Sequence, residues 1–147
     1  MPMRPVPCVL SIAGSDSGGG AGIQADLKAF ARCRVHGATA ITAVTAQNTH
    51  EVTAIQPVAP EVIVAQVRAV AGDLGVDAVK IGMLGSIDTI HAVARALQEL
   101  DDDVPIVVDP VMLAESGARL LDDEAVSLLV TEILPRALVA TPNLAEA

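Results

Sequence analysis

Five stretches of this sequence carry residue types suited to holding a small polar ligand. The longest is a loop rich in glycine and serine at residues 14–22, and four shorter stretches centre on Gln47, Met83, Asp109 and Asn143. Each of them follows an apolar run of the kind that forms a buried strand. Ligands of open α/β sheets bind beyond the carboxyl ends of the strands, so the sequence predicts one ligand site built from all five stretches.

The glycine loop admits several readings. No Gly-Lys-Ser/Thr follows it, which excludes a P-loop. Gly20, Gly22 and Ala25 match a relaxed dinucleotide fingerprint, but they start seven residues after the strand, and Gln47 stands where an acid that binds ribose is expected. A flexible connection is another reading, at a high ordering cost for five glycines. We expect a loop whose backbone amides face a small polar ligand closely.

Three side chains have the chemistry to recognise a heterocyclic ring. Asp26 is expected in the first turn of the helix after the loop, either as a surface carboxylate favoured by the helix dipole or as an acceptor for a ligand nitrogen. Gln47 offers one acceptor and two donors, which suit the edge of a heterocycle or a turn cap. Met83 is either an adaptable pocket wall or a core methionine.

Two carboxylates and an amide have the chemistry to hold Mg²⁺ and phosphate. Asp109 ends an apolar strand, where a carboxylate is costly unless it binds something such as a hard cation. Asn143 and Glu146 lie three residues apart and also fit a capping box at a helix start, which needs no ligand. Beside Asp109, the pair favours a site for Mg²⁺ and phosphate.

The elements that must position these residues alternate between strand and helix. Apolar and β-branched runs predict strands at residues 7–13, 38–46, 52–58, 77–81, 104–108 and 137–140. Helical spacing predicts a first helix to about His36 with Gly37 as its cap, and further helices starting near Pro60, Ser86 and Asp122. The order indicates a single α/β domain over residues 1–147, with a mainly parallel sheet flanked by helices.

Composition and charge exclude several classes of protein. The net charge of −9 and the single aromatic residue, Phe30, argue against nucleic acid as a partner. No apolar stretch reaches the roughly 18 residues that span a bilayer, and no signal peptide is recognised, so we expect a cytoplasmic protein without a membrane partner. Cys8 and Cys33 are expected to be buried, reduced thiols, and the three scattered histidines predict no metal cluster.

Five blocks of the sequence together resemble the hydroxymethylpyrimidine/phosphomethylpyrimidine kinases of thiamine biosynthesis, which belong to the ribokinase-like superfamily. The blocks are AGSDSGGGAGIQADLK at 13–28, TAQNT at 45–49, KIGML at 80–84, DPVM at 109–112 and TPNLAEA at 141–147. They cover nearly the whole chain in the order of the family. The resemblance implies a three-layer α/β/α fold, of which this sequence is the N-terminal part and therefore incomplete.

The resemblance also implies a reaction and a set of site residues. ATP would phosphorylate 4-amino-5-hydroxymethyl-2-methylpyrimidine on its hydroxymethyl group, and the same site would then phosphorylate the monophosphate. The residues implied around the pyrimidine are Gly14, Asp26, Gln47, Met83 and Val111. Asp109 and Glu146 would hold Mg²⁺, and Asn143 and Glu146 would organise the ATP phosphates.

Two departures from the family pattern limit what the resemblance implies. Glu115 lies in the neighbourhood where the family usually has a lysine after the fifth strand. The family's catalytic cysteine or aspartate and its anion hole belong to a C-terminal half, so no catalytic residue is assigned here. Because Ala147 falls where a new helix is expected to begin, we expect the sequence to end inside an element and the 147-residue chain to have little or no kinase activity.

Two other functions and one assembly remain open. A kinase for a pyridoxal-type ring would use a similar scaffold, and a non-catalytic module that binds a small molecule would need the same pocket. A homodimer is the assembly left open.

Overall fold

The computed structural model describes residues 6–112, 121–144 and 146, which form a parallel sheet, a small hairpin and flanking helices. The parallel strands, in the spatial order β2-β1-β5-β6-β7, are β1 (Cys8–Ala13), β2 (His36–Ile41), β5 (Ala78–Ile81), β6 (Ile106–Val108) and β7 (Val139–Ala140). A second, antiparallel sheet pairs β3 (Ala43–Gln47) with β4 (Val52–Pro57). The predicted α/β class with a mainly parallel sheet is confirmed.

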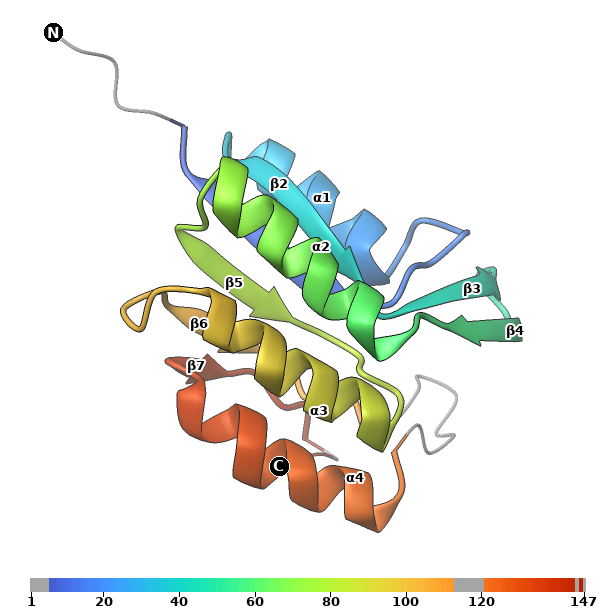
Figure 1. Cartoon of the computed structure of the whole chain (residues 1–147). Coiled ribbons are helices and arrows are strands. Elements are labelled where there is room, and N and C mark those ends of the chain that lie inside the picture. Colours follow the sequence, from blue (N-terminus) through green and yellow to red (C-terminus); the bar gives the residue numbers. More distant parts are fainter. Residues whose placement is uncertain (1–5, 113–120, 145, 147) are drawn as a thin grey trace, which may run out of the picture.

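Helices cover both faces of the main sheet and complete three layers. In Figure 1, α2 (Pro60–Asp73), α3 (Ile87–Ala96) and α4 (Asp123–Leu128) lie in front of the sheet, and α1 (Gly22–Arg32) lies behind it. Short turns extend two of them, namely η1 (Leu97–Glu99) after α3, and η2 (Leu129–Ile133) and η3 (Leu134–Arg136) after α4. Among the described residues, no helix is both long and apolar enough to cross a membrane.

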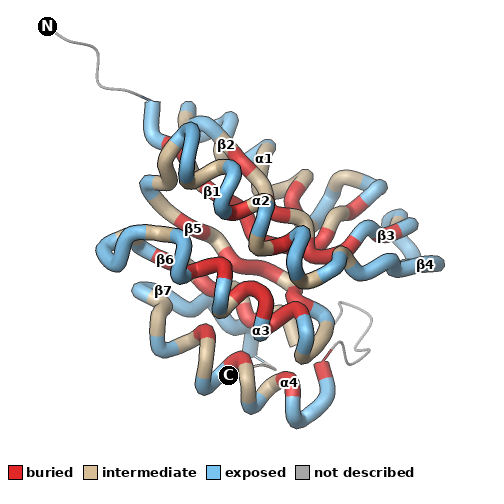
Figure 2. Tube along the Cα trace, viewed as in Figure 1, coloured by how far each residue is buried: buried red, intermediate tan, exposed pale blue. Residues whose placement is uncertain are grey.

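The main core lies between the sheet and the helices in front of it. Alternate residues of β1 and β5 point into this layer, where they meet the apolar faces of α2 and α3. The largest fully buried side chains are Leu10, Ile12, Ile63, Ile81, Ile90, Leu97, Leu129 and Ile133. Figure 2 shows this layer in red, whereas the β3–β4 hairpin is largely pale blue and exposed. Burying each such side chain stabilises the fold by roughly 1.5–3 kcal/mol.

Residues 38–46, which were predicted as one strand, form two strands with different partners. β2 ends at Ile41, and β3 starts at Ala43 and pairs with β4 outside the main sheet. Buried Thr42 makes the bend, where its N–H donates to the Ala13 carbonyl (3.0 Å) and its Oγ1 to the Met83 carbonyl (3.2 Å). A continuous β-branched run cannot reveal this bend, because its cause is hydrogen bonds to distant residues.

The first helix ends earlier than predicted, and Gly37 is not its cap. α1 ends at Arg32, and Arg34 adopts the left-handed conformation with φ of 61°. Gly37 lies in β2, where an added Cβ would be 2.6 Å from Cδ2 of Leu27 in α1. Gly37 therefore lets α1 pack closely on the sheet, a role that sequence alone could not separate from capping.

Other local predictions are confirmed, with one exception. The Ser86 hydroxyl accepts from the N–H of Thr89 (3.2 Å) and the Asp122 carboxylate from that of Ala125 (2.8 Å), so both residues cap helices. Both cysteines are free thiols; Cys8 is buried as expected, but Cys33 is exposed beyond the end of α1.

Candidate functional site

The glycine loop folds around the carboxylate of its own Asp16. Oδ1 of Asp16 accepts from the N–H of Gly18 (2.8 Å), and Oδ2 accepts from Gly20 (2.9 Å) and Ala21 (2.8 Å). Burial opposes the charge of Asp16, which is only 5% exposed, but these backbone N–H groups hold its pKa below the ordinary value. The prediction that the loop amides face a ligand is therefore wrong for these three groups.

Hydrogen bonds to β3 fix the loop at one edge of the molecule. Ser15 donates its N–H to the Ala43 carbonyl (2.8 Å) and accepts at Oγ from the N–H of Thr45 (3.0 Å). Ser17 exchanges two short bonds with the backbone of Gln47, at 2.6 and 2.7 Å. The loop thus runs beside β3 and ends next to Gln47.

The side chain of Gln47 retains hydrogen-bonding capacity. Its Oε1 lies 3.2 Å from the Thr45 hydroxyl and shares the hydrogen of that hydroxyl with the closer Ser15 carbonyl (2.8 Å), whereas Nε2 has no partner within the described part of the chain. The side chain is only partly exposed. An amide held on one side and open on the other suits the reading of a ring edge better than the capping of a turn.

Gly14 and Met83 lie in contact, as the predicted pocket requires. A Cβ on Gly14 would be 3.1 Å from Cε of Met83, so this position keeps the methionine methyl close to the backbone. The Gly14 carbonyl accepts from the N–H of Ile23 (3.0 Å) at the start of α1. Gly22 makes this approach feasible, because it has φ of 55° and a Cβ there would be 2.4 Å from the Gly14 oxygen.

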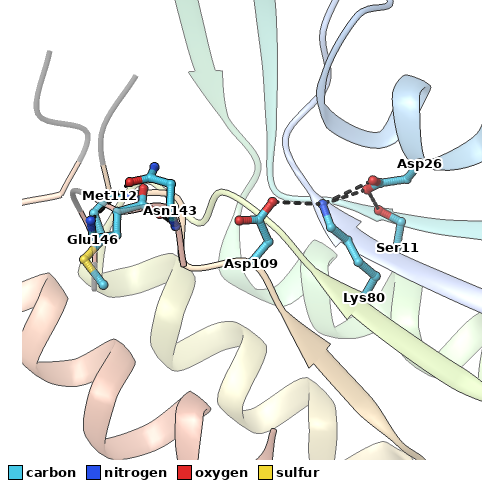
Figure 3. A network of polar contacts seen from close by, with 7 residues as sticks. All are labelled: Ser11, Asp26, Lys80, Asp109, Met112, Asn143 and Glu146. Atoms are coloured by element: carbon cyan, nitrogen blue, oxygen red, sulfur yellow. Dashed lines mark hydrogen bonds and ion pairs between the residues drawn. The ribbon is translucent and has the colours of Figure 1, made fainter. Parts of the chain in front are cut away.

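A charged network lies on the sheet face that α1 covers. Oδ2 of Asp26 accepts from the Ser11 hydroxyl (2.6 Å), and Nζ of Lys80 lies 3.1 and 3.2 Å from the two carboxylate oxygens of Asp26. Lys80 Nζ also lies 4.0 Å from Oδ2 of Asp109, so it stands between the two carboxylates (Figure 3). Asp26 belongs to the second turn of α1, so the reading as a first-turn surface carboxylate is wrong.

Lys80, Ser11 and Asp16 were not identified as functional residues from the sequence. A signal for Lys80 was present, because a lysine inside an apolar strand is costly unless it is paired. Parallel register places Ser11 beside Lys80 on one face of the sheet. The pairing of Lys80 with Asp26 depends on how α1 crosses that face of the sheet. A local sequence pattern cannot predict this crossing.

Asn143 and Glu146 form the capping box that was the alternative to a phosphate site. The Glu146 carboxylate accepts from the N–H of Asn143 (3.1 Å), and Oδ1 of Asn143 accepts from the N–H of Glu146 (3.1 Å). Glu146 also accepts from the N–H of Met112 (2.9 Å), which ties this turn to the segment after β6. Both oxygens of Glu146 are thus bound to backbone, and the two residues lie together in Figure 3.

Asp109 lies between this turn and the Lys80 network. Burial raises the pKa of its carboxyl above the ordinary value. The Lys80 ammonium opposes this rise in pKa, while the negative charges of Glu146 and Asp26 add to it. The side chain of Asp109 is 39% exposed. The Val111 N–H donates to the backbone carbonyl of Asp109 (2.9 Å). The ionised form of a carboxyl that is partly desolvated and close to other acids is stabilised by a nearby cation.

Asp109 fits Mg²⁺ as a single carboxylate rather than as part of a protein cage. Residues 6–112, 121–144 and 146 contain no group of three or more His, Cys, Asp or Glu placed to hold a metal. Mg²⁺ keeps several waters and usually binds one or two carboxylates together with substrate phosphates. The carboxylate of Asp109 meets that need, whereas the oxygens of Glu146 already accept from backbone. Glu115 lies outside the described residues.

Comparison with known sequences gives consistent matches. Residues 16–147 match the family model described as phosphomethylpyrimidine kinase. Proteins named hydroxymethylpyrimidine/phosphomethylpyrimidine kinase from Rhizobium meliloti and Bacillus subtilis are 59% and 53% identical over 138 residues, which is 94% of this chain. That alignment covers 51% of each relative, so the chain spans about half the length of the curated relatives it matches.

Solved structures share the fold. A phosphomethylpyrimidine kinase from Clostridium difficile superposes with a TM-score of 0.89 at 44% identity, over 95% of this chain and 60% of that one. A pyridoxal kinase from Staphylococcus aureus, solved with AMP-PCP, gives 0.82 at 33% identity, over 97% of this chain and 51% of that one. The expected ribokinase-like architecture is confirmed by both.

Proposed function

This chain belongs to the phosphomethylpyrimidine kinase family, and we propose that it serves in the ATP-dependent phosphorylation of 4-amino-5-hydroxymethyl-2-methylpyrimidine and of its monophosphate. One observation carries the proposal. The glycine loop contacts Gln47 and Met83, and the helix that follows the loop carries Asp26 to Lys80, which also lies 4.0 Å from Asp109. Transfer of a phosphoryl group to a ring alcohol needs groups that bind the ring and a carboxylate that can bind a cation beside it, and these residues supply both.

The aminopyrimidine would be held by residues that differ in chemistry. Gln47 would pair with the ring edge through Nε2, and Asp26 would accept from the exocyclic amine. Gly14 and Met83, which are in contact, would form an apolar wall, and half-buried Val111 would close the opposite side. Each role uses either an atom that can still form a hydrogen bond or an apolar surface.

The phosphates would lie on the side of Asp109. Mg²⁺, when bound, neutralises charge on the transferred phosphoryl group. Asp109 would orient that ion through its partly exposed carboxylate, as proposed from the sequence. For Asn143 and Glu146, the capping box supports a role in shaping the turn below the nucleotide. Direct contact of Glu146 with Mg²⁺ would require its carboxylate to leave the N–H of Met112.

A substrate comparison tests the proposal. A pyridoxal kinase shares this fold closely, so a pyridoxal-type ring is the second candidate substrate. We expect kcat/KM for the aminopyrimidine alcohol to exceed that for pyridoxal at least about tenfold, since the two rings present different hydrogen-bonding edges. Steady-state assays of both alcohols with Mg-ATP in a full-length form of the protein check this. A preference for pyridoxal would reject the substrate, and binding of the pyrimidine without turnover would favour a non-catalytic module.

A cytoplasmic location and a homodimer are proposed as well. The exposed apolar side chains of the β3–β4 hairpin support a contact between two copies, namely Val44, Val52 and Ile55. Sedimentation equilibrium of the native protein distinguishes monomer from dimer.

A further inference from the structure

We propose that Lys80 is a positioning residue that fixes the Asp26 carboxylate for recognition of the aminopyrimidine and keeps it apart from the metal-side carboxylate of Asp109. The inference rests on the proposed function, in which Asp26 accepts from the ring's amine.

The contact between Lys80 and Asp26 is close and partly shielded from water. The ammonium lies 3.1 and 3.2 Å from the two carboxylate oxygens, and the side chains are 23% and 14% exposed. Arg68 and Glu99 form a shorter pair at 2.7 Å, but there the arginine is 66% exposed. Because water screens an exposed pair strongly, the Lys80–Asp26 pair restrains its carboxylate more than the surface pair does.

The surrounding strands hold the lysine in place. Lys80 lies in β5 between β1 and β6, in register with Ser11 and Val107. Gly82 leaves space for the ammonium, since a Cβ there would be 3.0 Å from Nζ of Lys80. The lysine is therefore positioned by rigid sheet and not by a mobile loop.

The same arrangement fixes the direction in which Asp26 can accept a further hydrogen bond. A carboxylate accepts about four hydrogen bonds. Ser11 and Lys80 already supply three contacts from two neighbouring strands. The remaining capacity suits one donor, such as the amine of an aminopyrimidine. Without Lys80, the carboxylate could rotate about its Ser11 bond and would face Asp109 as an uncompensated like charge.

Substitution of Lys80 tests the inference through binding rather than activity alone. We expect Lys80→Met to weaken binding of the aminopyrimidine alcohol about tenfold and Lys80→Arg to restore it to within about threefold, because arginine keeps the charge–carboxylate contact. KM for ATP should change less than the affinity for the alcohol, since Lys80 Nζ lies 3.1 Å from Asp26 and 4.0 Å from the metal-side carboxylate of Asp109. Calorimetric titration with the alcohol and steady-state kinetics of the native protein measure both. Arg68→Met is the matched control, and it should bind like the wild type.

A double-mutant cycle shows whether Lys80 acts through Asp26. If it does, Lys80→Met combined with Asp26→Asn should bind no more than about twofold more weakly than Asp26→Asn alone. Additive losses, or wild-type affinity in Lys80→Met, would overturn the inference. Absence of pyrimidine binding by the wild type would instead reject the proposed function.

Urea unfolding shows whether Lys80→Met folds. If it does not fold, a second variant tests the inference. Ser11→Ala removes the other restraint on the Asp26 carboxylate and should weaken binding of the alcohol about threefold. Undiminished affinity in folded Ser11→Ala would mean that orientation of Asp26 does not matter, and the inference would then fail.

Discussion

At the scale of single residues, the proposed recognition of an aminopyrimidine ring would depend on which hydrogen-bonding atoms remain available. Gln47 is bound to Ser17 through its backbone and to Thr45 through Oε1, so the amide is held in place before a ligand arrives. Its Nε2 has no partner in the part of the chain that the structure describes. A fixed donor of this kind can distinguish rings that differ only in the position of an acceptor.

Replacement of Gln47 by alanine should therefore affect one substrate selectively. We expect the KM for the aminopyrimidine alcohol to rise about three- to tenfold, the value of one neutral hydrogen bond, with less than about twofold change in the KM for ATP. Steady-state kinetics of the native protein measure both constants. Gln56→Ala in β4 is the control, because the exposed Gln56 side chain donates to the neighbouring Pro57 carbonyl at 3.3 Å. Equal KM values for the pyrimidine in wild type and Gln47→Ala would contradict the role.

At the scale of elements, the glycine loop is ordered by an acid within it. Five glycines would leave this loop costly to order. Asp16 offsets that cost, because its carboxylate accepts from three loop N–H groups at 2.8–2.9 Å. The serines of the loop hold it against β3.

The charge of Asp16 should make this stabilisation dependent on pH. Since the folded-state pKa is lowered, the contribution is complete above the ordinary aspartate pKa of about 3.9 and is lost as the pH falls through the lowered value. At pH 7, Asp16→Asn should lower the free energy of unfolding by roughly 1–3 kcal/mol, because the asparagine amide keeps one acceptor oxygen and turns an NH2 group toward loop N–H groups that the second carboxylate oxygen accepts in the wild type. Urea unfolding at pH 7 and below pH 4 measures the difference, which should shrink in acid.

The exposed Asp102→Asn is the control for the removal of a charge, and it should be close to neutral at both pH values. A stability difference between wild type and Asp16→Asn that stays constant down to the lowest pH would show that the charge of Asp16 does not order the loop.

At the scale of the whole molecule, the chain carries the residues proposed to hold the ring and the metal, but it spans about half the length of its relatives. The family's catalytic residue and anion hole were expected in the half that has no counterpart here. Among the described residues, the groups at the rim can bind and orient, and no nucleophile or base at the site has been assigned.

The purified 147-residue chain should for this reason be a poor kinase. Loss of a set of groups that stabilise the transition state typically costs 10²–10³-fold or more, so we expect kcat at least roughly a hundredfold below that of a full-length relative. A coupled assay of ADP release with the aminopyrimidine alcohol, run beside the Bacillus subtilis relative, makes the comparison. Similar turnover in the two proteins would contradict the prediction.

Residue type and spacing were sufficient to predict the alternation of strands and helices, the helix caps at Ser86 and Asp122, and the position of Gly14 and Asp109 directly after parallel strands. These features follow from short-range physics, because hydrophobic periodicity is local and parallel strands bring their carboxyl ends to one edge. The same local information could not reveal the bend at Thr42 or the packing role of Gly37.

The tertiary structure alone decided which polar groups satisfy one another. The Asp16 carboxylate accepts hydrogen bonds from loop N–H groups that were expected to face a ligand. Lys80 forms an ion pair with Asp26 and lies 4.0 Å from Asp109. Both arrangements depend on the crossing of segments far apart in the chain. A buried charge must find a partner, but only the fold determines which partner lies within reach.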